Sequence, residues 1–213
     1  MKIDINSLPP ATQYKLISST VVPRPIALVS TYSATNGDNA APFSFFNVMG
    51  ENPPALVIGL ETKRSNKALK DTTINIMENG EFVVHMVDES IAKSMVICGI
   101  DFPSNVSETT QAGLTLVPSE LIKAKRILEA PVAFECEKIT FLQISPDRHI
   151  VVAKILMMHV RDELLDLETY YINPDKYFPI GRMFGSLYTK TRDHFEMTIP
   201  SYDAWKEEHS NNN

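Results

Sequence analysis

Cysteine is scarce in this chain, and its spacing argues against both disulfide bonds and a structural metal site. Cys98 and Cys136 are the two cysteines among 213 residues, and they form no Cys-x-x-Cys pair. The histidines, five in all, lack the spacing of metal ligands. We therefore expect no disulfide framework and no metal site, and we predict that both thiols are buried.

Basic clusters are also few. The formal net charge is −6, with 20 lysine and arginine residues against 26 aspartate and glutamate residues. The basic residues gather at residues 63–70 and 123–126, and each group is too small to follow a nucleic-acid backbone. We expect no nucleic-acid partner, although either group is large enough to bind one phosphate.

Long apolar runs and signal-like segments are absent. The longest apolar run, residues 150–160, is too short to span a bilayer and contains Lys154. The first ten residues, MKIDINSLPP, lack the apolar region of a secretory signal. These features predict a cytoplasmic protein that does not enter a membrane.

Two widespread catalytic motifs are missing. The chain has no G-x-S-x-G turn of the kind that presents a nucleophilic serine, and no G-x-G-x-x-G loop of a dinucleotide-binding βαβ unit. A nicotinamide cofactor would therefore have to bind transiently, outside a Rossmann domain.

The composition is that of a globular protein with a sizeable core. Hydrophobic residues make up 44% and charged residues 22%. The length suits one domain. We predict a single domain over residues 1–213, with extensions at 1–20 and 190–213 packed on it.

Local patterns predict many strands and few helices. Residues 131–139 alternate, for example, with Val132 and Phe134 on one face and Glu135 on the other. Such a composition of elements favours an antiparallel barrel. Residues 100–129 form a polar, proline-containing connector of the kind that builds or covers a site. We expect strands at 26–31, 55–61, 81–88, 131–139 and 149–160, and helices at 7–17 (capped by Ser7), 67–77 (capped by Ser65 and ended by Gly80) and 89–99.

The stretch NAAPFSFFNVMGENPPALVIGLE, residues 39–61, combines small, aromatic and hydroxyl residues with residues that favour irregular backbone. Its first part is expected to return as the second arm of a hairpin after strand 26–31. Alternation would place Phe43 and Phe45 on one face and Ser44 and Phe46 on the other. Such a segment is expected to form a binding surface as well as core.

Eight sequence segments, taken together with their order along the chain, identify a protein family more specifically than any one segment alone. They are RPIALVST, NGDNAAPFSFFNVMGENPPALVIGLE, KDTTINI, GEFVVHMVDE, AGLTLVPS, APVAFECE, HIVVAKILMMHV and FPIGRMFGSLY. Together they cover most of the chain. In this order the sequence resembles the flavin reductase-like family, which has an FMN-binding split barrel.

The resemblance implies a mainly β fold: an antiparallel, Greek-key-like split β-barrel with a few peripheral helices, as in flavoredoxin-like proteins. It implies a homodimer with one FMN in each of two clefts near the subunit interface. The family chemistry is reduction of flavin by NADH or NADPH, with nicotinamide as a transient co-substrate. Reduced flavin then passes to a partner, such as a monooxygenase or another electron-accepting protein.

Two other functions stay open at this point. The protein could hold FMN as an electron carrier without its own nicotinamide reaction. It could also have lost flavin and serve as a structural or interaction domain.

The resemblance also implies site residues. Ala41, Pro42, Phe43 and Ser44 would run along the edge of the flavin ring, with Asn47 as a further candidate at that edge. The alternative for the aromatic residues is core packing, and for Asn47 it is a turn.

The phosphate and the ribityl chain of FMN need cationic and hydrogen-bonding groups. The resemblance assigns the phosphate to Lys63, Arg64, Ser65, Lys70 and Thr72, and the ribityl chain to Ser30 and Thr31. Any single lysine could equally belong to a solvated helix start, and the two strand-end hydroxyls could be structural caps. Arg182 and Tyr188 could reach the cleft or the subunit interface, and Trp205 has no assigned role.

Overall fold

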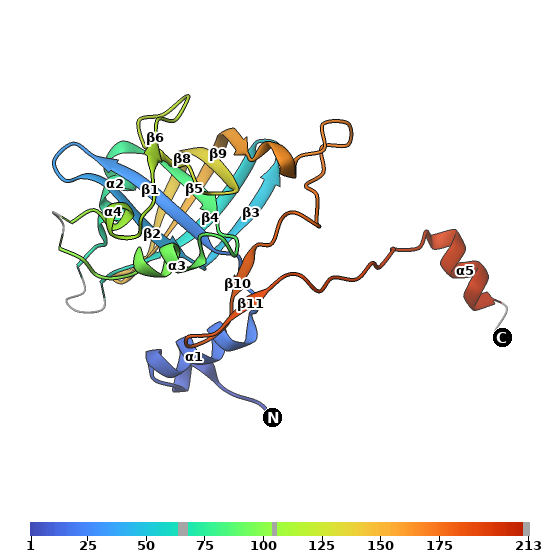
Figure 1. Cartoon of the computed structure of the whole chain (residues 1–213). Helices are drawn as coiled ribbons and strands as arrows, with labels where there is room; N and C mark the ends of the chain where they lie inside the picture. The colour runs from blue at the N-terminus through green and yellow to red at the C-terminus, as the bar shows by residue number, and fades with distance from the viewer. Residues whose placement is uncertain (64–67, 104–105, 211–213) are drawn as a thin grey trace.

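The computed structural model describes residues 1–63, 68–103 and 106–210, and its centre is an antiparallel sheet (Figure 1). Within these ranges, seven strands pair in the order β2-β1-β5-β8-β9-β4-β3. The strands are β1 (Ala27–Ser33), β2 (Gly37–Phe43), β3 (Phe46–Glu51), β4 (Pro54–Glu61), β5 (Glu81–Met86), β8 (Val132–Ser145) and β9 (Arg148–Val160). The predicted mainly β class is confirmed.

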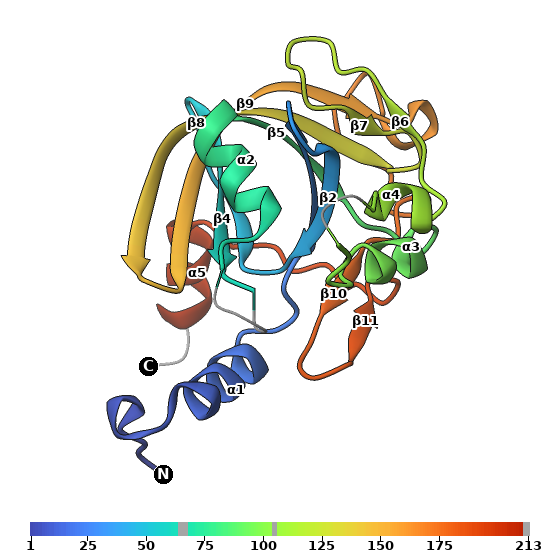
Figure 2. The ribbon, with the colours of Figure 1, turned by 90° about the vertical axis from the view of Figure 1, so that its left-hand side faces the viewer.

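The sheet rolls into a barrel because its two edge strands are consecutive in the chain. Strands β2 and β3 stand at opposite ends of the strand order, yet only Ser44 and Phe45 separate them. The two edges must therefore meet at this bend, as Figure 2 shows. Gly59 N on β4 donates to Phe45 O at 2.7 Å and holds the bend. The predicted hairpin is confirmed, because β1 pairs with β2 in antiparallel register. After the bend the chain continues as β3, which pairs with β4.

Strand β1 is buried on both of its faces. Ala27 and Val29 belong to the cluster of apolar side chains inside the barrel, together with Phe43 and Phe82. Leu28, which points the other way, belongs to a second cluster that lies under α3 and the connector. Two buried faces explain why the first three residues of this strand, Ala27–Val29, are all apolar.

Helix α2 (Asp71–Asn79) packs against β1, with Thr72, Asn75 and Ile76 buried. The predicted end is confirmed, since Gly80 adopts φ 74°, which suits a glycine after the last helical turn. The helix begins at Asp71 rather than at 67, and its predicted cap, Ser65, lies outside the described residues.

The amino-terminal helix starts later than predicted. Helix α1 spans Pro10–Thr20, after a short 3-10 turn over Ile5–Ser7. Ser7 is not its cap. Leu8 and Pro9 each precede a proline, which favours extended backbone, and both are extended, so the helix can begin only at Pro10.

Helix α3 (Ala92–Ile97) is shorter than the predicted 89–99. Asp88 accepts hydrogen bonds from the backbone N–H groups of Ser90 and Ile91, which makes a turn before the helix. Strand β8 runs beyond residue 139 to Ser145. Its second half was not predicted because bulges there interrupt the alternation of buried and exposed residues. The connector holds α4 (Glu108–Gln111), β6 (Leu116–Val117) and β7 (Arg126–Ile127).

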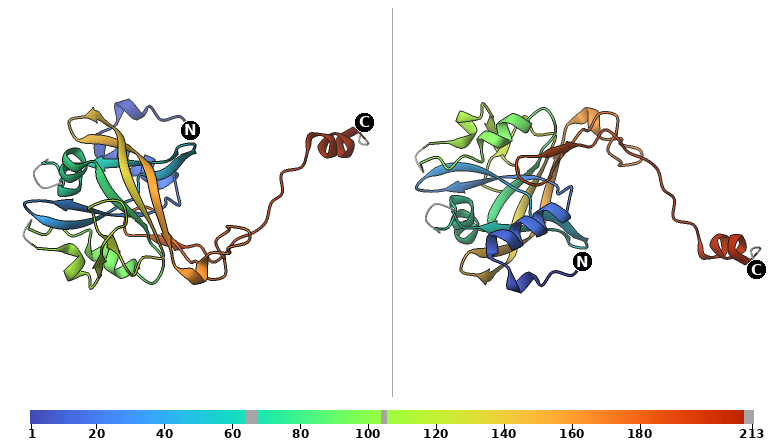
Figure 3. Two further views of the ribbon diagram at one scale, coloured as in Figure 1. Left: turned by 90° about the horizontal axis from the view of Figure 1, so that it is seen from above. Right: turned by 90° about the horizontal axis from the view of Figure 1, so that it is seen from below.

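The carboxyl-terminal part of the chain first packs near the barrel and then leaves it. After the 3-10 turn η2 (Asp162–Leu164), β10 (Ile180–Arg182) and β11 (Tyr188–Lys190) form a small ribbon, named here the strap, which lies near α1 in Figure 1. Beyond it the chain leaves the barrel, and α5 (Tyr202–Ser210) stands apart (Figure 3). Phe195 and Ile199 are 83% and 93% exposed.

The expected packing of residues 190–213 on the barrel is therefore not seen in the described part of this single chain. The apolar side chains of this segment alternate with Glu196 and Thr198, as in a strand, and find no partner strand here. The division into one domain with two extensions stays a prediction.

Two further predictions concern cysteines and membrane segments. Both cysteines are buried free thiols, as predicted. Burial raises the pKa of Cys98 to about 12. In the described ranges, no helix is long and apolar enough to cross a membrane.

Candidate functional site

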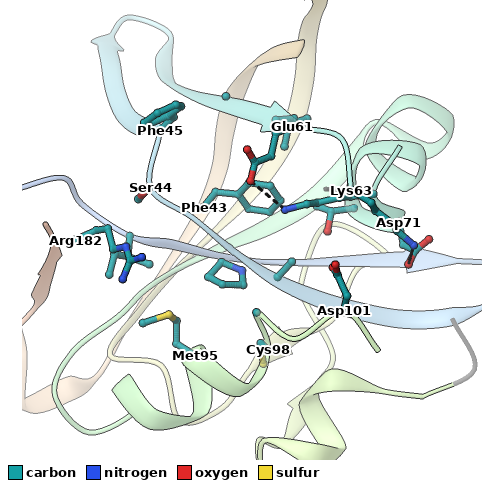
Figure 4. A pocket seen from close by; sticks show the side chains of 18 of the residues that line it. Phe43, Ser44, Phe45, Glu61, Lys63, Asp71, Met95, Cys98, Asp101 and Arg182 are labelled. Atoms are coloured by element: carbon teal, nitrogen blue, oxygen red, sulfur yellow. Dashed lines mark hydrogen bonds and ion pairs between the residues drawn. The ribbon is translucent and has the colours of Figure 1, made fainter. Parts of the chain in front are cut away.

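A cavity of about 740 Å³ opens beside the bend that joins β2 to β3. We call it the seam cavity. Its walls come from β2, β4, α3, the first residues of the connector, the start of β9 and the strap. Figure 4 shows side chains from these elements around one open space. Its volume is in the range of small-molecule and cofactor sites.

One wall of the seam cavity is apolar and closely packed. Phe43 on β2 and Met95 on α3 are both buried and border the cavity, although they belong to different apolar clusters (Figure 4). A Cβ on Gly99 would lie 3.4 Å from Pro42 Cγ and 3.2 Å from Val96 O. Glycine therefore lets the segment after α3 approach the β2 edge closely.

One end of the seam cavity carries paired charges. Lys63 Nζ lies 3.3 Å from Asp71, and Lys70 Nζ lies 3.5 Å from Glu61. Arg148 contacts the same Glu61 at 2.7 Å. These side chains are partly exposed, and such pairs contribute little stability. An anionic group could therefore replace the carboxylates as the partner of the lysines.

Polar groups line the floor near these charges. The Asn39 amide and the Thr72 hydroxyl lie 2.8 Å apart, and Thr72 is buried at the start of α2. Glu108 borders the cavity, and burial raises the pKa of its carboxyl. The floor thus offers both donors and acceptors.

His149 carries a buried polar atom without a partner. Its side chain is 6% exposed, and Nδ1 has no hydrogen-bond partner among the residues that the structure describes. Its ring lies 5.3 Å from that of Phe141 and borders the seam cavity. Buried polar atoms normally have partners, so this one fits a site that a polar ligand completes.

The structure brings most of the predicted site residues together. The following line the seam cavity: Ala41, Pro42, Phe43, Ser44, Lys63, Lys70 and Thr72. Arg182 and Tyr188 line it too, with the Arg182 guanidinium 4.5 Å from the centre of the Tyr188 ring. Arg64 and Ser65 lie outside the described residues.

Three predicted residues do not line the seam cavity. Ser30 is buried and donates its hydroxyl to Lys125 O at 2.5 Å. Thr31 is buried and accepts a hydrogen bond from Asn75 at 2.9 Å. Asn47 is exposed, and its side chain accepts from the N–H of Val48. Ser30 and Thr31 thus bond to distant segments of the fold, and Asn47 bonds to its neighbour in the chain.

Several cavity residues were not anticipated. They include Glu61, Asp71, Met95, Cys98, Asp101, Arg148 and His149. Glu61 and His149 come to the same cavity because β4 pairs with β9. This pairing aligns Glu61 with Arg148 and Leu60 with His149. Local sequence carries no signal for that register. The connector over residues 100–129 was predicted to build or cover a site, and its first residues, Ile100, Asp101 and Phe102, line the cavity.

A family model covers most of the chain. Residues 18–181 match the model of the "Flavin reductase like domain". An "Uncharacterized protein" of Aquifex aeolicus is 45% identical over 84% of this chain and 90% of its own length.

Two solved structures are similar over nearly their whole lengths. Pseudomonas fluorescens 2-nitrobenzoate 2-nitroreductase NbaA is 40% identical with a TM-score of 0.86, covering 95% of this chain and 98% of its own. Nitrilotriacetate monooxygenase component B from Bacillus cereus is 31% identical with a TM-score of 0.85, covering 92% and 98%. These neighbours support a flavin-related oxidoreductase. The chain belongs to the flavin reductase-like family.

Proposed function

We propose that the seam cavity binds FMN and that the protein passes hydride from NADH or NADPH to the bound flavin. The observation that carries the proposal is that one cavity unites the small-residue edge at Ala41–Ser44 with the lysines at 63 and 70. These groups match the two chemically distinct ends of FMN.

The ring of FMN is flat and broad, with an apolar face and a polar pyrimidine edge. In this proposal the edge lies along Ala41–Ser44, where Pro42 restricts the backbone and the Ser44 hydroxyl is a donor. Phe43 and Met95 supply the apolar wall. His149 Nδ1 is a candidate partner for a polar group of the ligand.

The phosphate end of FMN would lie by Lys63, Lys70 and Thr72, at the amino-terminal end of α2. Arg64 and Ser65 belong to the proposed set as well. Binding would exchange the pairs with Asp71 and Glu61 for pairs with phosphate. Ser30, Thr31 and Asn47 are left out because they lie off the cavity.

The flavin, when bound, supplies the two-electron chemistry, in which nicotinamide C4 gives up a hydride and flavin N5 receives it. The chain's own residues orient the ring, exclude water and fix charges around it. No acid–base pair is required of the protein.

An anaerobic mixing experiment tests this function. Purified protein loaded with FMN should lose its yellow colour rapidly on addition of NADH or NADPH. Reduction only by dithionite or by a protein partner would instead support an electron carrier. Colourless protein that fails to bind added FMN would contradict flavin binding altogether.

The relatives suggest two electron acceptors to assay. The nitroreductase name of one neighbour suggests a nitroaromatic acid, so 2-nitrobenzoate is a first probe. The monooxygenase component suggests release of reduced flavin to an oxygenase partner. Consumption of the nitro compound by this protein alone would favour the former.

We also propose a homodimer in the cytoplasm. Exposed apolar side chains at Val48 and Met49 on β3 and at Ile17 on α1 support an interface, with 57%, 59% and 48% of each exposed. Light scattering on the purified protein should give twice the mass of one chain, and a monomer mass would contradict the dimer.

A further inference from the structure

Arg24 is a buried cation directly behind the bend of the seam cavity. Its side chain is 7% exposed. Among the described residues it forms no ion pair with a carboxylate, and burial lowers its pKa. Burying an arginine without an acid is costly unless its donors are satisfied, so the contacts of this side chain need an explanation.

The guanidinium donates to carbonyl oxygens of two separate segments. Nη1 donates to Ser18 O at 2.6 Å and to Val21 O at 2.9 Å, at the carboxyl-terminal end of α1. Nη2 donates to Met183 O at 2.8 Å, just after β10. A cation is favourable at the end of a helix, where carbonyl groups point outward. The charge is thus solvated by dipoles and not cancelled by an anion.

The backbone of Arg24 reinforces this position. Its N–H donates to Arg182 O at 3.0 Å, and its carbonyl accepts from Arg182 N at 2.8 Å. Arg182 lines the seam cavity. One residue therefore ties helix α1 and the strap to each other at the rim of the cavity.

The Nε donor of Arg24 points to the bend itself. Nε lies 3.5 Å from Ser44 Oγ, at the long end of the hydrogen-bond range. The guanidinium also lies 5.7 Å from the centre of the Phe45 ring. Ser44 lines the cavity, so Arg24 stands one side chain away from any ligand there.

We propose that Arg24 is a positioning residue for the flavin, holding Ser44 in place and stabilising the negative charge that the ring gains on reduction. The inference rests on the proposed function. In a water-poor site, a nearby fixed charge acts strongly on a group whose charge changes. Arg24 therefore makes the bound flavin easier to reduce.

The test compares Arg24→Gln with Arg24→Lys by equilibrium binding of FMN and by the midpoint potential of the bound flavin. Arg24→Gln should lower the preference for reduced over oxidised flavin about tenfold, which for two electrons is a shift of about 30 mV to more negative potential. Arg24→Lys keeps the charge and should keep the potential. Arg192→Gln is the control, because Arg192 is exposed, pairs with Glu89 and does not line the seam cavity. An unchanged potential in Arg24→Gln would overturn the role of the charge.

A double-mutant cycle with Ser44→Ala tests the positioning. Arg24→Lys should weaken FMN binding several-fold in the normal background and have little further effect when Ser44 is already alanine. Strictly additive effects would overturn the positioning role. This arm decides the matter even if Arg24→Gln fails to fold, which thermal melts will show.

The two proposals fail in different ways. If the unaltered protein does not bind FMN, the proposed function is wrong. If it binds FMN and the Arg24 variants match it in potential and affinity, only the present inference is wrong.

Discussion

The buried pair His85 and Glu135, beside the connector, differs from His149, beside the seam cavity, in how far its polar atoms are hydrogen-bonded. Beside the connector, His85 and Glu135 are fully buried and their ring nitrogens and carboxylate oxygens are all hydrogen-bonded. Beside the seam cavity, His149 Nδ1 lacks a partner among the described residues, and Lys63 and Lys70 form only partly exposed ion pairs. Satisfied groups stabilise a fold, whereas under-satisfied groups are available to a ligand. For these residues the comparison separates a structural role, that of His85 and Glu135, from a binding role, that of His149 and the two lysines.

Glu135 shows how the connector is attached. Oε1 accepts from Glu120 N at 2.7 Å and lies 2.6 Å from His159 Nε2, and Oε2 accepts from Leu121 N at 2.8 Å. Burial alone would raise the pKa of Glu135, but the bonds from Glu120, His159 and Leu121 outweigh it and hold the pKa below its usual value. The carboxylate thus binds the connector to β8.

Replacing Glu135 should produce the largest change in stability. Glu135→Ala leaves two backbone N–H groups without partners, so we expect a loss of about 3 kcal/mol or more in the free energy of unfolding. Urea denaturation measures it. Glu137→Ala, at an exposed position on the same strand, should change stability by less than about 0.5 kcal/mol. The FMN affinity of the folded Glu135→Ala protein should be unchanged. A loss of affinity as well as of stability would contradict the distinction between structural and binding residues.

His85 gives a prediction about pH. Its Nδ1 lies 2.8 Å from Leu28 O, and its Nε2 accepts from Ile127 N at 2.8 Å. Burial lowers the pKa of His85 to about 4. Because the unfolded pKa is about 6.5, the folded state binds fewer protons than the unfolded state between these values. This contribution to stability is present above pH 6.5 and is lost as the pH falls toward 4.

Acidification from pH 7.5 to 5 should therefore cost about 2 kcal/mol through His85 alone. Urea titrations measure the free energy of unfolding at both pH values. In His85→Gln the difference between the two values should be smaller by about 2 kcal/mol. His194→Gln, at an exposed histidine, should keep the full pH dependence. Equal pH dependence in all three proteins would contradict the assignment to His85.

On the cavity side, Lys70→Ala should affect binding and not stability. The loss of one phosphate contact should weaken FMN binding about tenfold, while riboflavin, which lacks the phosphate, should bind as before. Fluorescence titration measures both ligands. Lys154→Ala, at an exposed lysine on β9, should leave both affinities unchanged. Equal losses for FMN and riboflavin would place the phosphate elsewhere.

The smallest expected effect is that of Ser44→Ala. It removes one donor at the ring edge, so we expect FMN affinity to fall about threefold to tenfold or the flavin potential to shift, with an unchanged melting temperature. Affinity and potential both equal to those of the unaltered protein would remove Ser44 from the site.

Local patterns predicted an antiparallel barrel, because apolar runs marked most of its strands. The site at Ala41–Ser44 was predicted from the resemblance to the family, and these residues do line the cavity. Ser30 and Thr31 carry similar hydroxyls, yet the structure places them against Lys125 and Asn75. Their positions depend on how the sheet closes and on what covers each face, which no local pattern records.

Long-range pairing explains the other differences. Glu135 was expected on a polar face of its strand, but the connector returns over it and makes it fully buried. His149 acquires its place because β9 pairs with β4. Such contacts join residues far apart in the chain, so their chemistry becomes visible only in three dimensions.

The most direct test of the account is a crystal structure of the protein soaked or grown with FMN. We predict electron density for the ring along Ala41–Ser44, with the phosphate beside Lys63 and Lys70. Flavin bound outside the seam cavity, or a cavity closed by side chains in crystals that contain FMN, would contradict the central claim.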